Sequence, residues 1–280
     1  MKIKSIFSRL CLGAAIAATG AVQVNADTIQ VFGNGVDDLS AFNGGTDGSD
    51  TALVSVIGGQ LSVLDNDATD APEAYVDFGN VTDGVRLEFD FEFNTADLDV
   101  VNTNPEVLIR FGNNGVETDS NADTGFQLNL RHANDSTNQI RAANGTSSTS
   151  SGLGDFVDLA DGESFNIIAL INNDSVAQDY TELGGGTVAA GTYDLFINGG
   201  LIGNFDVVTT ATSGFDPALG LGTFGLNSSG SDDAGVEVLF DNITIGIGED
   251  NGFFTAVPEP SSAILLLSGL FSLGLIRRRN

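Results

Sequence analysis

Residues 85–93 read VRLEFDFEF, with apolar and charged side chains in strict alternation. Successive side chains of a β-strand point to opposite faces of a sheet, so the apolar positions of this segment share one face. The charged positions share the other face. The segment therefore predicts a strand that contributes phenylalanines to a core and exposes an acidic stripe, which consists of Arg86, Glu88, Asp90 and Glu92.

Segments of the same kind recur along the chain, separated by turns rich in Asn, Asp, Gly and Ser. No stretch between Asp27 and Thr255 keeps a helical period for three turns, and the chain contains 36 glycines. We therefore expect one all-β domain over residues 27–250, a two-sheet antiparallel jelly-roll sandwich. Its predicted strands are Ala52–Ile57, Gln60–Leu64, Ala74–Phe78, Val85–Phe93, Glu106–Phe111, Gly125–His132, Gln139–Ala142, Ser164–Asn172, Thr192–Asn198, Leu201–Val208, Gly220–Asn227 and Val236–Ile247.

Two local patterns add detail to this sandwich. Asn198-Gly199 lies between two apolar runs and predicts a hairpin turn, because both residue types accept a positive φ. In the last strand the apolar positions change parity, from Val236, Val238 and Phe240 to Ile243, Ile245 and Ile247. The side-chain alternation must therefore slip by one residue, which predicts a β-bulge near Asp241-Asn242.

The hairpin from Tyr193 to Phe205 and the closing strand from Val238 to Ile243 resemble the concanavalin A-like, or laminin G-like, jelly roll. The resemblance spans most of residues 28–248. That superfamily includes lectins, adhesion modules, polysaccharide lyases and glycosidases. The resemblance therefore implies a fold and leaves the function open.

The first 26 residues have the pattern of a secretory signal peptide. Lys2, Lys4 and Arg9 precede a short apolar run that ends at Ala21, and Val24-Asn25-Ala26 offers small residues for cleavage. The mature chain is then expected to begin at Asp27. The single cysteine, Cys11, lies inside this segment, so we expect a mature chain without disulfides or thiolate metal sites.

The last 24 residues form a second targeting segment, preceded by a linker over residues 251–256. Val257-Pro258-Glu259-Pro260 leads into the apolar run 263–276, and Arg277, Arg278 and Arg279 follow. Fourteen helical residues span about 21 Å, which is short for a bilayer core of about 30 Å. We therefore expect a marginal transmembrane helix whose arginines stay on the cytoplasmic side.

This order of motif, apolar helix and arginine cluster resembles the PEP-CTERM sorting signal of Gram-negative bacteria. The resemblance covers residues 257–280 alone. It implies export, transient membrane association through the C-terminal helix, and processing near Pro258-Glu259-Pro260 by exosortase, a membrane-embedded cysteine protease or transpeptidase. It also implies a location at the cell envelope or in an extracellular matrix rich in exopolysaccharide.

The body between these segments is strongly acidic. Six of the ten bases and one of the 38 acids lie in the two terminal segments, which leaves four bases and 37 acids, a net charge of −33. Phosphate recognition depends on clustered Lys and Arg, so we expect no nucleic-acid partner. The charge leaves two interpretations open: a solvated surface suited to salty water, or a fold that includes divalent cations. An anionic polysaccharide would be repelled unless calcium bridged it to the protein.

The acidic stripe raises the possibility of glycoside hydrolysis. Its spacing resembles the Glu-x-Asp-x-Glu strand of laminarinase-type glucanases, in which Glu88 would match the nucleophile, Asp90 the helper and Glu92 the acid/base. Those enzymes line their clefts with aromatic platforms, whereas this chain has no tryptophan and three tyrosines. The other interpretation is a surface stripe partly neutralised by arginines, since all four arginines of the body, Arg86, Arg110, Arg131 and Arg141, lie in predicted strands where cross-strand pairing with such acids is expected.

A second candidate site is the segment 119–125. Asp119, Asn121 and Asp123 place oxygen ligands at alternate positions, as calcium-binding loops do. Thr124 and Leu130 stand where an EF-hand needs Gly and Glu, which excludes that type of loop. The alternative is an acidic turn that enters the next strand. The only histidine, His132, ends that strand, and we expect it at the surface or rim rather than as a catalytic base.

These observations favour an exported, exosortase-processed sandwich that acts as a noncatalytic adhesion or carbohydrate-binding module, with or without calcium. Two alternatives stay open. One is a laminarinase-like glycoside hydrolase that uses Glu88 and Glu92, and the other is a purely structural matrix component.

Overall fold

The computed structural model describes residues 27–35, 39, 42–44, 54–65, 73–94, 106–115, 121–132, 137–143, 157–160, 163–228 and 236–247. The predicted signal peptide, the linker 251–256 and the predicted sorting segment 257–280 lie outside these residues. Within the described ranges, none of the residues belongs to a helix long and apolar enough to cross a membrane.

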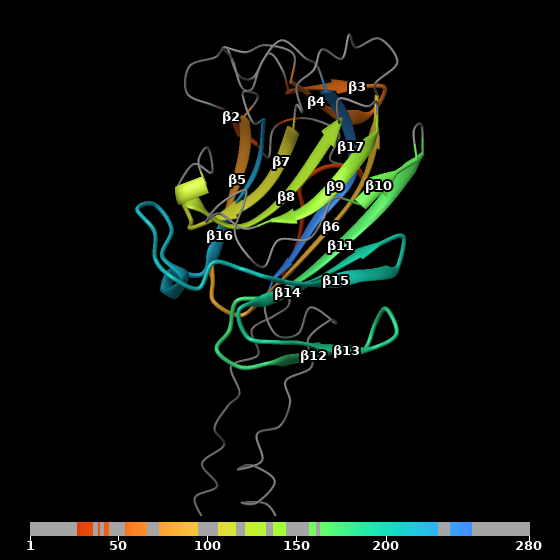
Figure 1. The fold of residues 1–280 in the computed structure, drawn as a ribbon. Coiled ribbons are helices and arrows are strands. Elements are labelled where there is room, and N and C mark those ends of the chain that lie inside the picture. Colours follow the sequence, from red (N-terminus) through yellow and green to blue (C-terminus); the bar gives the residue numbers. More distant parts are fainter. Residues whose placement is uncertain are drawn as a thin grey trace, which may run out of the picture.

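Two antiparallel sheets face each other across a core (Figure 1). The eight-stranded sheet has the order β15-β14-β11-β6-β17-β4-β3, and β1 pairs with β17. Its strands are β1 (Asp27–Gln30), β3 (Val54–Ile57), β4 (Gln60–Asp65), β6 (Gly84–Phe93), β11 (Ser164–Asn172), β14 (Thr192–Ile197), β15 (Gly200–Asp206) and β17 (Val236–Ile247).

The seven-stranded sheet has the order β10-β9-β8-β7-β16-β5-β2. Its strands are β2 (Asn43–Gly44), β5 (Glu73–Val81), β7 (Glu106–Gly112), β8 (Thr124–His132), β9 (Asn138–Ala143), β10 (Val157–Leu159) and β16 (Leu221–Ser228). A separate hairpin consists of β12 (Gln178–Tyr180) and β13 (Gly186–Val188), and two single-turn helices, η2 (Asn121–Asp123) and η3 (Pro217–Leu219), lie in loops.

The predicted antiparallel sandwich is therefore confirmed, and all twelve predicted strands are present with small shifts at their ends. Five further strands were not predicted: β1, β2, β10, β12 and β13. Each has two to four residues, which is too short for alternation to be visible in the sequence.

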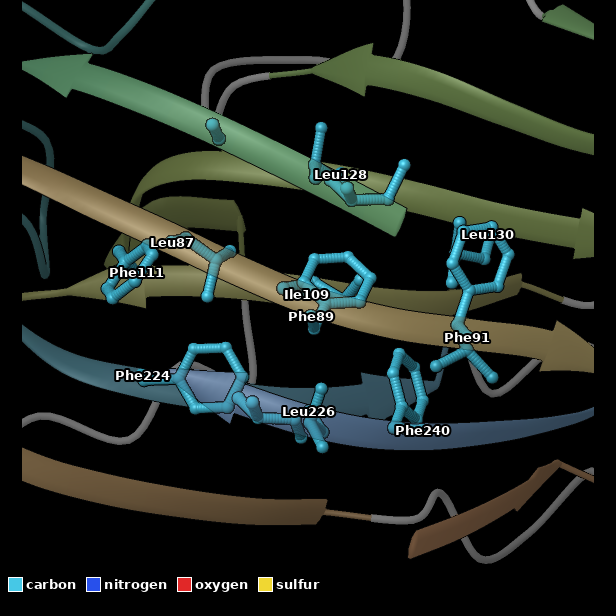
Figure 2. Packing of buried hydrophobic residues seen from close by; sticks show 14 of the residues in the cluster. Leu87, Phe89, Phe91, Ile109, Phe111, Leu128, Leu130, Phe224, Leu226 and Phe240 are labelled. Carbon is cyan, nitrogen blue, oxygen red and sulfur yellow. The ribbon is translucent and has the colours of Figure 1, made fainter. Parts of the chain in front are cut away.

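The core consists of aromatic and aliphatic side chains from the inner faces of both sheets (Figure 2). Leu87, Phe89, Phe91 and Phe93 of β6 are at most 5% exposed, as their alternation predicted. The ring centre of Phe89 lies 5.7 Å from that of Phe240 on β17, and Phe111 of β7 lies 5.5 Å from Phe224 on β16. Each such side chain contributes about 1.5–3 kcal/mol by leaving water. These two contacts lie within one sheet each, whereas Phe126 of β8 and Tyr193 of β14, with ring centres 4.7 Å apart, meet between the two sheets.

Both predicted local details are confirmed. Asn198 and Gly199, with φ of 50° and 75°, form the two-residue turn between β14 and β15. On β17, Asp241 pairs with Asp90 and Thr244 pairs with Glu88, so β17 has one residue more than β6 between these pairs. This bulge contains Asn242 at a φ of 52°, and it returns the isoleucines of β17 to the core.

The β12–β13 hairpin covers part of the outer face of the eight-stranded sheet. Tyr180 and Val188 pack on Ile168, Leu170 and Phe196 in a second apolar cluster. The Tyr180 hydroxyl donates a hydrogen bond of 3.1 Å to the buried Asp194 of β14. A Cβ atom on Gly186 would lie 2.3 Å from the Tyr180 hydroxyl, so any other residue at that position would displace the Tyr180 ring.

Candidate functional site

Three of the four arginines in the body lie on the outer face of the seven-stranded sheet. Arg110 is on β7, Arg131 on β8 and Arg141 on β9, each between side chains that point into the core. The expectation that all four arginines neutralise the acidic stripe is therefore wrong for these three, because the stripe belongs to the opposite sheet. The cross-strand order of β7, β8 and β9 brings the three arginines together on one surface.

A chain of hydrogen bonds links side chains on β7 and β8. The Nε atom of Arg110 donates to Oε1 of Gln127 over 3.0 Å, and Nε2 of Gln127 donates to Oδ1 of Asn129 over 2.7 Å. Asn129 in turn donates from Nδ2 to the carboxylate of Glu106. Arg110 pairs with Gln127 in the strand register, so the contact follows directly from the sheet.

A second series of contacts continues across β9 and β10. Arg131 donates from Nε to Oε1 of Gln139 over 2.7 Å, and Gln139 donates from Nε2 to Oδ1 of Asp158 over 2.7 Å. Arg141 lies 4.0 Å from Glu106. We call this whole set the arginine face: Glu106, Arg110, Gln127, Asn129, Arg131, Gln139, Arg141 and Asp158.

The arginine face is graded in its exposure. Arg110, Gln127 and Asn129, at 4%, 6% and 2% exposed, are buried, whereas Glu106, Arg131, Gln139 and Arg141 are half-buried. Burial raises the pKa of Glu106, and the neighbouring Arg141 and Asn129, followed by Arg131 and Arg110, act in the opposite direction. The result is a set of planar donors and acceptors held in fixed positions, of which Arg131, Gln139 and Arg141 are partly accessible to solvent.

The sequence contained part of the signal for this surface. Gln127, Asn129 and Arg131 alternate with core residues in β8, which indicates that they point outward. Alternation does not predict which strands pair with β8. It therefore predicts neither the neighbours of these polar side chains nor how deeply they are buried.

The acidic stripe lies on the outer face of β6 in the eight-stranded sheet. Arg86 and Glu88 form an ion pair within the stripe. Asn166 of β11 donates from Nδ2 to Oδ1 of Asp90 over 2.9 Å, and its Nδ2 lies 3.4 Å from Oε1 of Glu88. Asn242 donates to the other oxygen of Asp90 over 2.8 Å.

These contacts occupy the stripe with local partners. Each oxygen of Asp90 accepts a hydrogen bond from a side-chain amide, and Glu88 forms an ion pair with Arg86. Glu88 and Glu92 are four residues apart on one strand, a separation of about 13 Å between their Cα atoms. Retaining glycosidases hold their two carboxyl groups about 5–5.5 Å apart. The catalytic roles of Glu88, Asp90 and Glu92 stay a hypothesis.

The predicted calcium loop is described only in part, since Asp119 lies outside the described residues. Asn121 and Asp123 bound the short helix η2. The Asp123 carboxylate lies against Gly214, where a Cβ atom would come within 1.4 Å of Oδ1. No group of three His, Cys, Asp or Glu side chains suited to a metal occurs in the part of the chain that the structure describes. Calcium binding at Asp119, Asn121 and Asp123 stays a prediction.

His132 is not at the surface, contrary to expectation. It ends β8 on the core side and is 4% exposed, with Nδ1 2.6 Å from Oδ1 of Asn138. The alternation Phe126, Leu128, Leu130 of β8 continues inward to His132, and this parity could have predicted its burial.

The sequence matches no model of a known protein family, and no curated protein matches it. Among solved structures, a sialidase is similar at 12% identity with a TM-score of 0.51, over 81% of this chain and 19% of the sialidase chain. The carbohydrate recognition domain of Emp47p is similar at 9% identity with a TM-score of 0.50, over 82% of this chain and 99% of that domain. A marine alginate lyase from Zobellia galactanivorans matches at 11% identity with a TM-score of 0.46, over 80% and 94% of the two chains.

At these identities the likeness concerns the fold alone. The chain spans about a fifth of the sialidase chain and nearly the whole recognition domain of Emp47p. The body therefore has the fold of a two-sheet antiparallel jelly roll, as predicted.

Proposed function

We propose that this protein is an exported, noncatalytic carbohydrate-binding module whose ligand contacts the arginine face. The observation that carries the proposal is the hydrogen-bonded set of planar polar side chains across β7, β8, β9 and β10. In a body with 37 acids and four arginines, three arginines gather on one sheet beside only two acids, Glu106 and Asp158, so the arginine face has a net charge of +1.

The chemistry of the arginine face suits a polyhydroxylated ligand. Adjacent hydroxyls of a sugar act as paired donors and acceptors, and guanidinium, amide and carboxylate groups present such pairs in one plane. Arg131 and Gln139 already hold each other in place, so less side-chain freedom is lost on binding. The half-buried members can reach a ligand while the buried ones fix their geometry.

The fold gives independent support. The Emp47p domain that shares this architecture is a carbohydrate recognition domain, and it is matched over almost its full length. The similarity is one of fold, so the assignment of a ligand to this chain depends on the arginine face itself.

The proposal includes the route by which the protein reaches its ligand. The signal pattern of residues 1–26 and the sorting pattern of residues 257–280 support export, membrane association before processing, and recognition by exosortase. The protein would then act at the cell envelope or in the extracellular matrix. Intact mass of the protein from its native host should give a chain that begins at Asp27 and ends near Pro258-Glu259-Pro260. A chain that retains both ends would contradict this route.

Calcium is the remaining part of the proposal. The net charge of −33 and the spacing of Asp119, Asn121 and Asp123 support a bound divalent cation. Calcium should then raise the melting temperature of the full chain, and Asp123→Asn should abolish the increase. A site saturated at 100 times its Kd adds about 2.7 kcal/mol, so a change below about 2 °C between calcium and chelator would remove calcium from the proposal.

Binding is tested by affinity electrophoresis against laminarin, xylan, pectin, alginate and the exopolysaccharide of the native host. We expect at least one polysaccharide to retard the full chain. Arg131→Gln should weaken that binding about tenfold, as expected for the loss of a charge-assisted hydrogen bond.

The matched control is Arg86→Gln, the same substitution on the opposite sheet. It should leave the affinity within about twofold. Equal losses in both variants would contradict binding at the arginine face. The absence of retardation by every polysaccharide would favour the structural matrix component instead.

A further inference from the structure

The structure describes the side chains of three Asn-Gly pairs, which differ in how firmly their reacting groups are held. The asparagines are Asn34, Asn114 and Asn198, and all three are exposed. An Asn-Gly pair is chemically labile, because the backbone nitrogen of a residue without a side chain can approach the side-chain carbonyl carbon of the preceding asparagine. Since exposure is common to the three pairs, their hydrogen bonds decide which of them reacts.

The pair Asn114-Gly115 is held at both reacting groups. Oδ1 of Asn114 accepts a hydrogen bond of 2.9 Å from the backbone amide of Gly79. The backbone amide of Gly115, which contains the nitrogen that would attack, donates to Oδ1 of Asp77 over 3.0 Å. The attack therefore requires two hydrogen bonds to break.

The pair Asn198-Gly199 is held at the carbonyl. Oδ1 of Asn198 accepts a hydrogen bond of 2.9 Å from the backbone amide of Asn166 on β11. This contact fixes the side chain beside the neighbouring strand, so at least one hydrogen bond must break before the carbonyl can turn toward the nitrogen of Gly199.

The pair Asn34-Gly35 lies in a turn after β1. Asn34 has a φ of 50° and stands between Gly33 and Gly35, whose φ angles are 79° and 96°. Within the residues that the structure describes, no hydrogen bond holds the Asn34 side chain. The glycine on each side leaves the backbone free to rotate toward the geometry of attack.

We propose that Asn34 is a site of spontaneous deamidation and that its isoaspartate form loosens β1. The nitrogen of Gly35 bonds to Cγ of Asn34, and the bond from Cγ to Nδ2 breaks. The side-chain nitrogen leaves as ammonia and takes the proton of the Gly35 nitrogen. Water then opens the five-membered imide at one of its two carbonyls, which gives aspartate or isoaspartate. Neither step needs an enzyme, an oxidant or a cofactor.

The position of the turn explains why isoaspartate would disturb the fold. Isoaspartate carries the backbone through Cγ, which lengthens the main chain by one methylene group. The adjoining Gly33 fits closely on the bulge of β17, since a Cβ atom there would lie 2.5 Å from Oδ1 of Asp241 and 2.6 Å from the nitrogen of Asn242. A longer main chain shifts this close contact, so the pairing of β1 with β17 is weakened.

The test is peptide mass spectrometry of the purified full chain during incubation at mildly alkaline pH. Deamidation replaces an amino group by a hydroxyl group and is visible as an increase in peptide mass. Each hydrogen bond that must break slows the reaction about tenfold, so Asn198 should convert about tenfold and Asn114 about a hundredfold more slowly than Asn34. Equal rates at the three asparagines, or a faster reaction at Asn114 than at Asn34, would overturn the proposal.

A pair of matched variants tests the role of the hydrogen bonds. Asp77→Ala removes the acceptor of the Gly115 amide and should accelerate the conversion of Asn114 about tenfold, with the rate at Asn34 unchanged. Asp77→Asn keeps an acceptor oxygen and should leave both rates within about twofold. An unchanged rate at Asn114 in Asp77→Ala would overturn the explanation by hydrogen bonds.

Hydrogen exchange tests the effect on β1. The amides of β1 should exchange faster in the aged chain than in the fresh chain. Asn34→Asp has the charge of the product without the additional methylene group, so its β1 amides should exchange as in the fresh wild type. Unchanged exchange of β1 in a chain converted at Asn34, or equally fast exchange in Asn34→Asp, would overturn the proposed effect of isoaspartate.

Discussion

The side-chain amide of Asn242 donates a hydrogen bond of 2.8 Å to Oδ2 of Asp90, although Asn242 itself lies in the left-handed region at a φ of 52°. The same residue thus forms the bulge of β17 and fixes a carboxylate on β6. Asparagine tolerates this backbone conformation better than other residues with a Cβ atom.

Substitution of Asn242 separates these two roles. Asn242→Gly keeps the backbone conformation and loses the amide, so we expect a decrease in the free energy of unfolding of about 1 kcal/mol. Asn242→Ala also places an ordinary residue at positive φ, and we expect a decrease of about 2 kcal/mol. Urea denaturation of the full chain measures both. Equal losses would show that the backbone conformation contributes nothing.

The contact between Tyr180 and Asp194 predicts a loss of stability in alkali. Burial, the hydrogen bond to Asp194 and the charge of Asp194 raise the pKa of Tyr180 to about 12, against about 10 in the unfolded chain. The folded chain therefore holds the phenol proton more tightly, and this contribution is complete below pH 10 and lost as the pH rises through 12. At pH 11 the contribution of Tyr180 alone should be about 1.4 kcal/mol less favourable than at pH 8.

Tyr180→Phe removes the contribution of this phenol and should make the loss of stability between pH 9 and pH 11 less steep than in the wild type. Burial also raises the pKa of Tyr193, but Tyr193 is present in both chains and cancels in the difference. Parallel profiles for the wild type and Tyr180→Phe between pH 9 and pH 11 would contradict the assignment.

Because Glu106 is buried, we expect the free energy of unfolding to depend on pH in the acidic range. Burial raises its folded pKa above the ordinary value of 4.5, so the folded chain binds the proton more tightly than the unfolded chain. The contribution is complete below about 4.5 and is lost as the pH rises through the folded pKa. The free energy of unfolding of the wild type, minus that of Glu106→Gln, should therefore increase as the pH falls from 7 toward 4.5. A difference that is constant or decreases would contradict this.

The noncatalytic assignment predicts no release of sugar. Incubation of the wild type with laminarin should give no reducing ends above those of Glu88→Gln, because Glu88 contacts Arg86 and both oxygens of Asp90 accept amides. Reducing ends released by the wild type and lost in Glu88→Gln would replace the proposal with the glycoside hydrolase.

The sequence predicted best those features that depend on neighbouring residues. The alternation in residues 85–93 gave both the strand β6 and its buried face, and the parity change in β17 gave the bulge at Asn242. Each is local, since side-chain direction follows from position along a strand.

Features that depend on which strands become neighbours could not be obtained in this way. Arg110 and Gln127 are partners because β7 and β8 pair, and Arg131 reaches Gln139 because β9 follows. The strands of the β12–β13 hairpin have three residues each, too few for an alternation of apolar and polar side chains to be recognised. The hairpin that covers Asp194 was therefore not predicted.

The most direct test of the proposed binding face is the side-chain amide spectrum of the isotope-labelled full chain, titrated with an oligosaccharide of whichever polysaccharide retards it. We expect the amide signals of Gln127, Asn129 and Gln139 to shift, while those of Asn166 and Asn242 beside the acidic stripe stay in place. Shifts at Asn166 and Asn242 with none at the three amides of the arginine face would contradict the account.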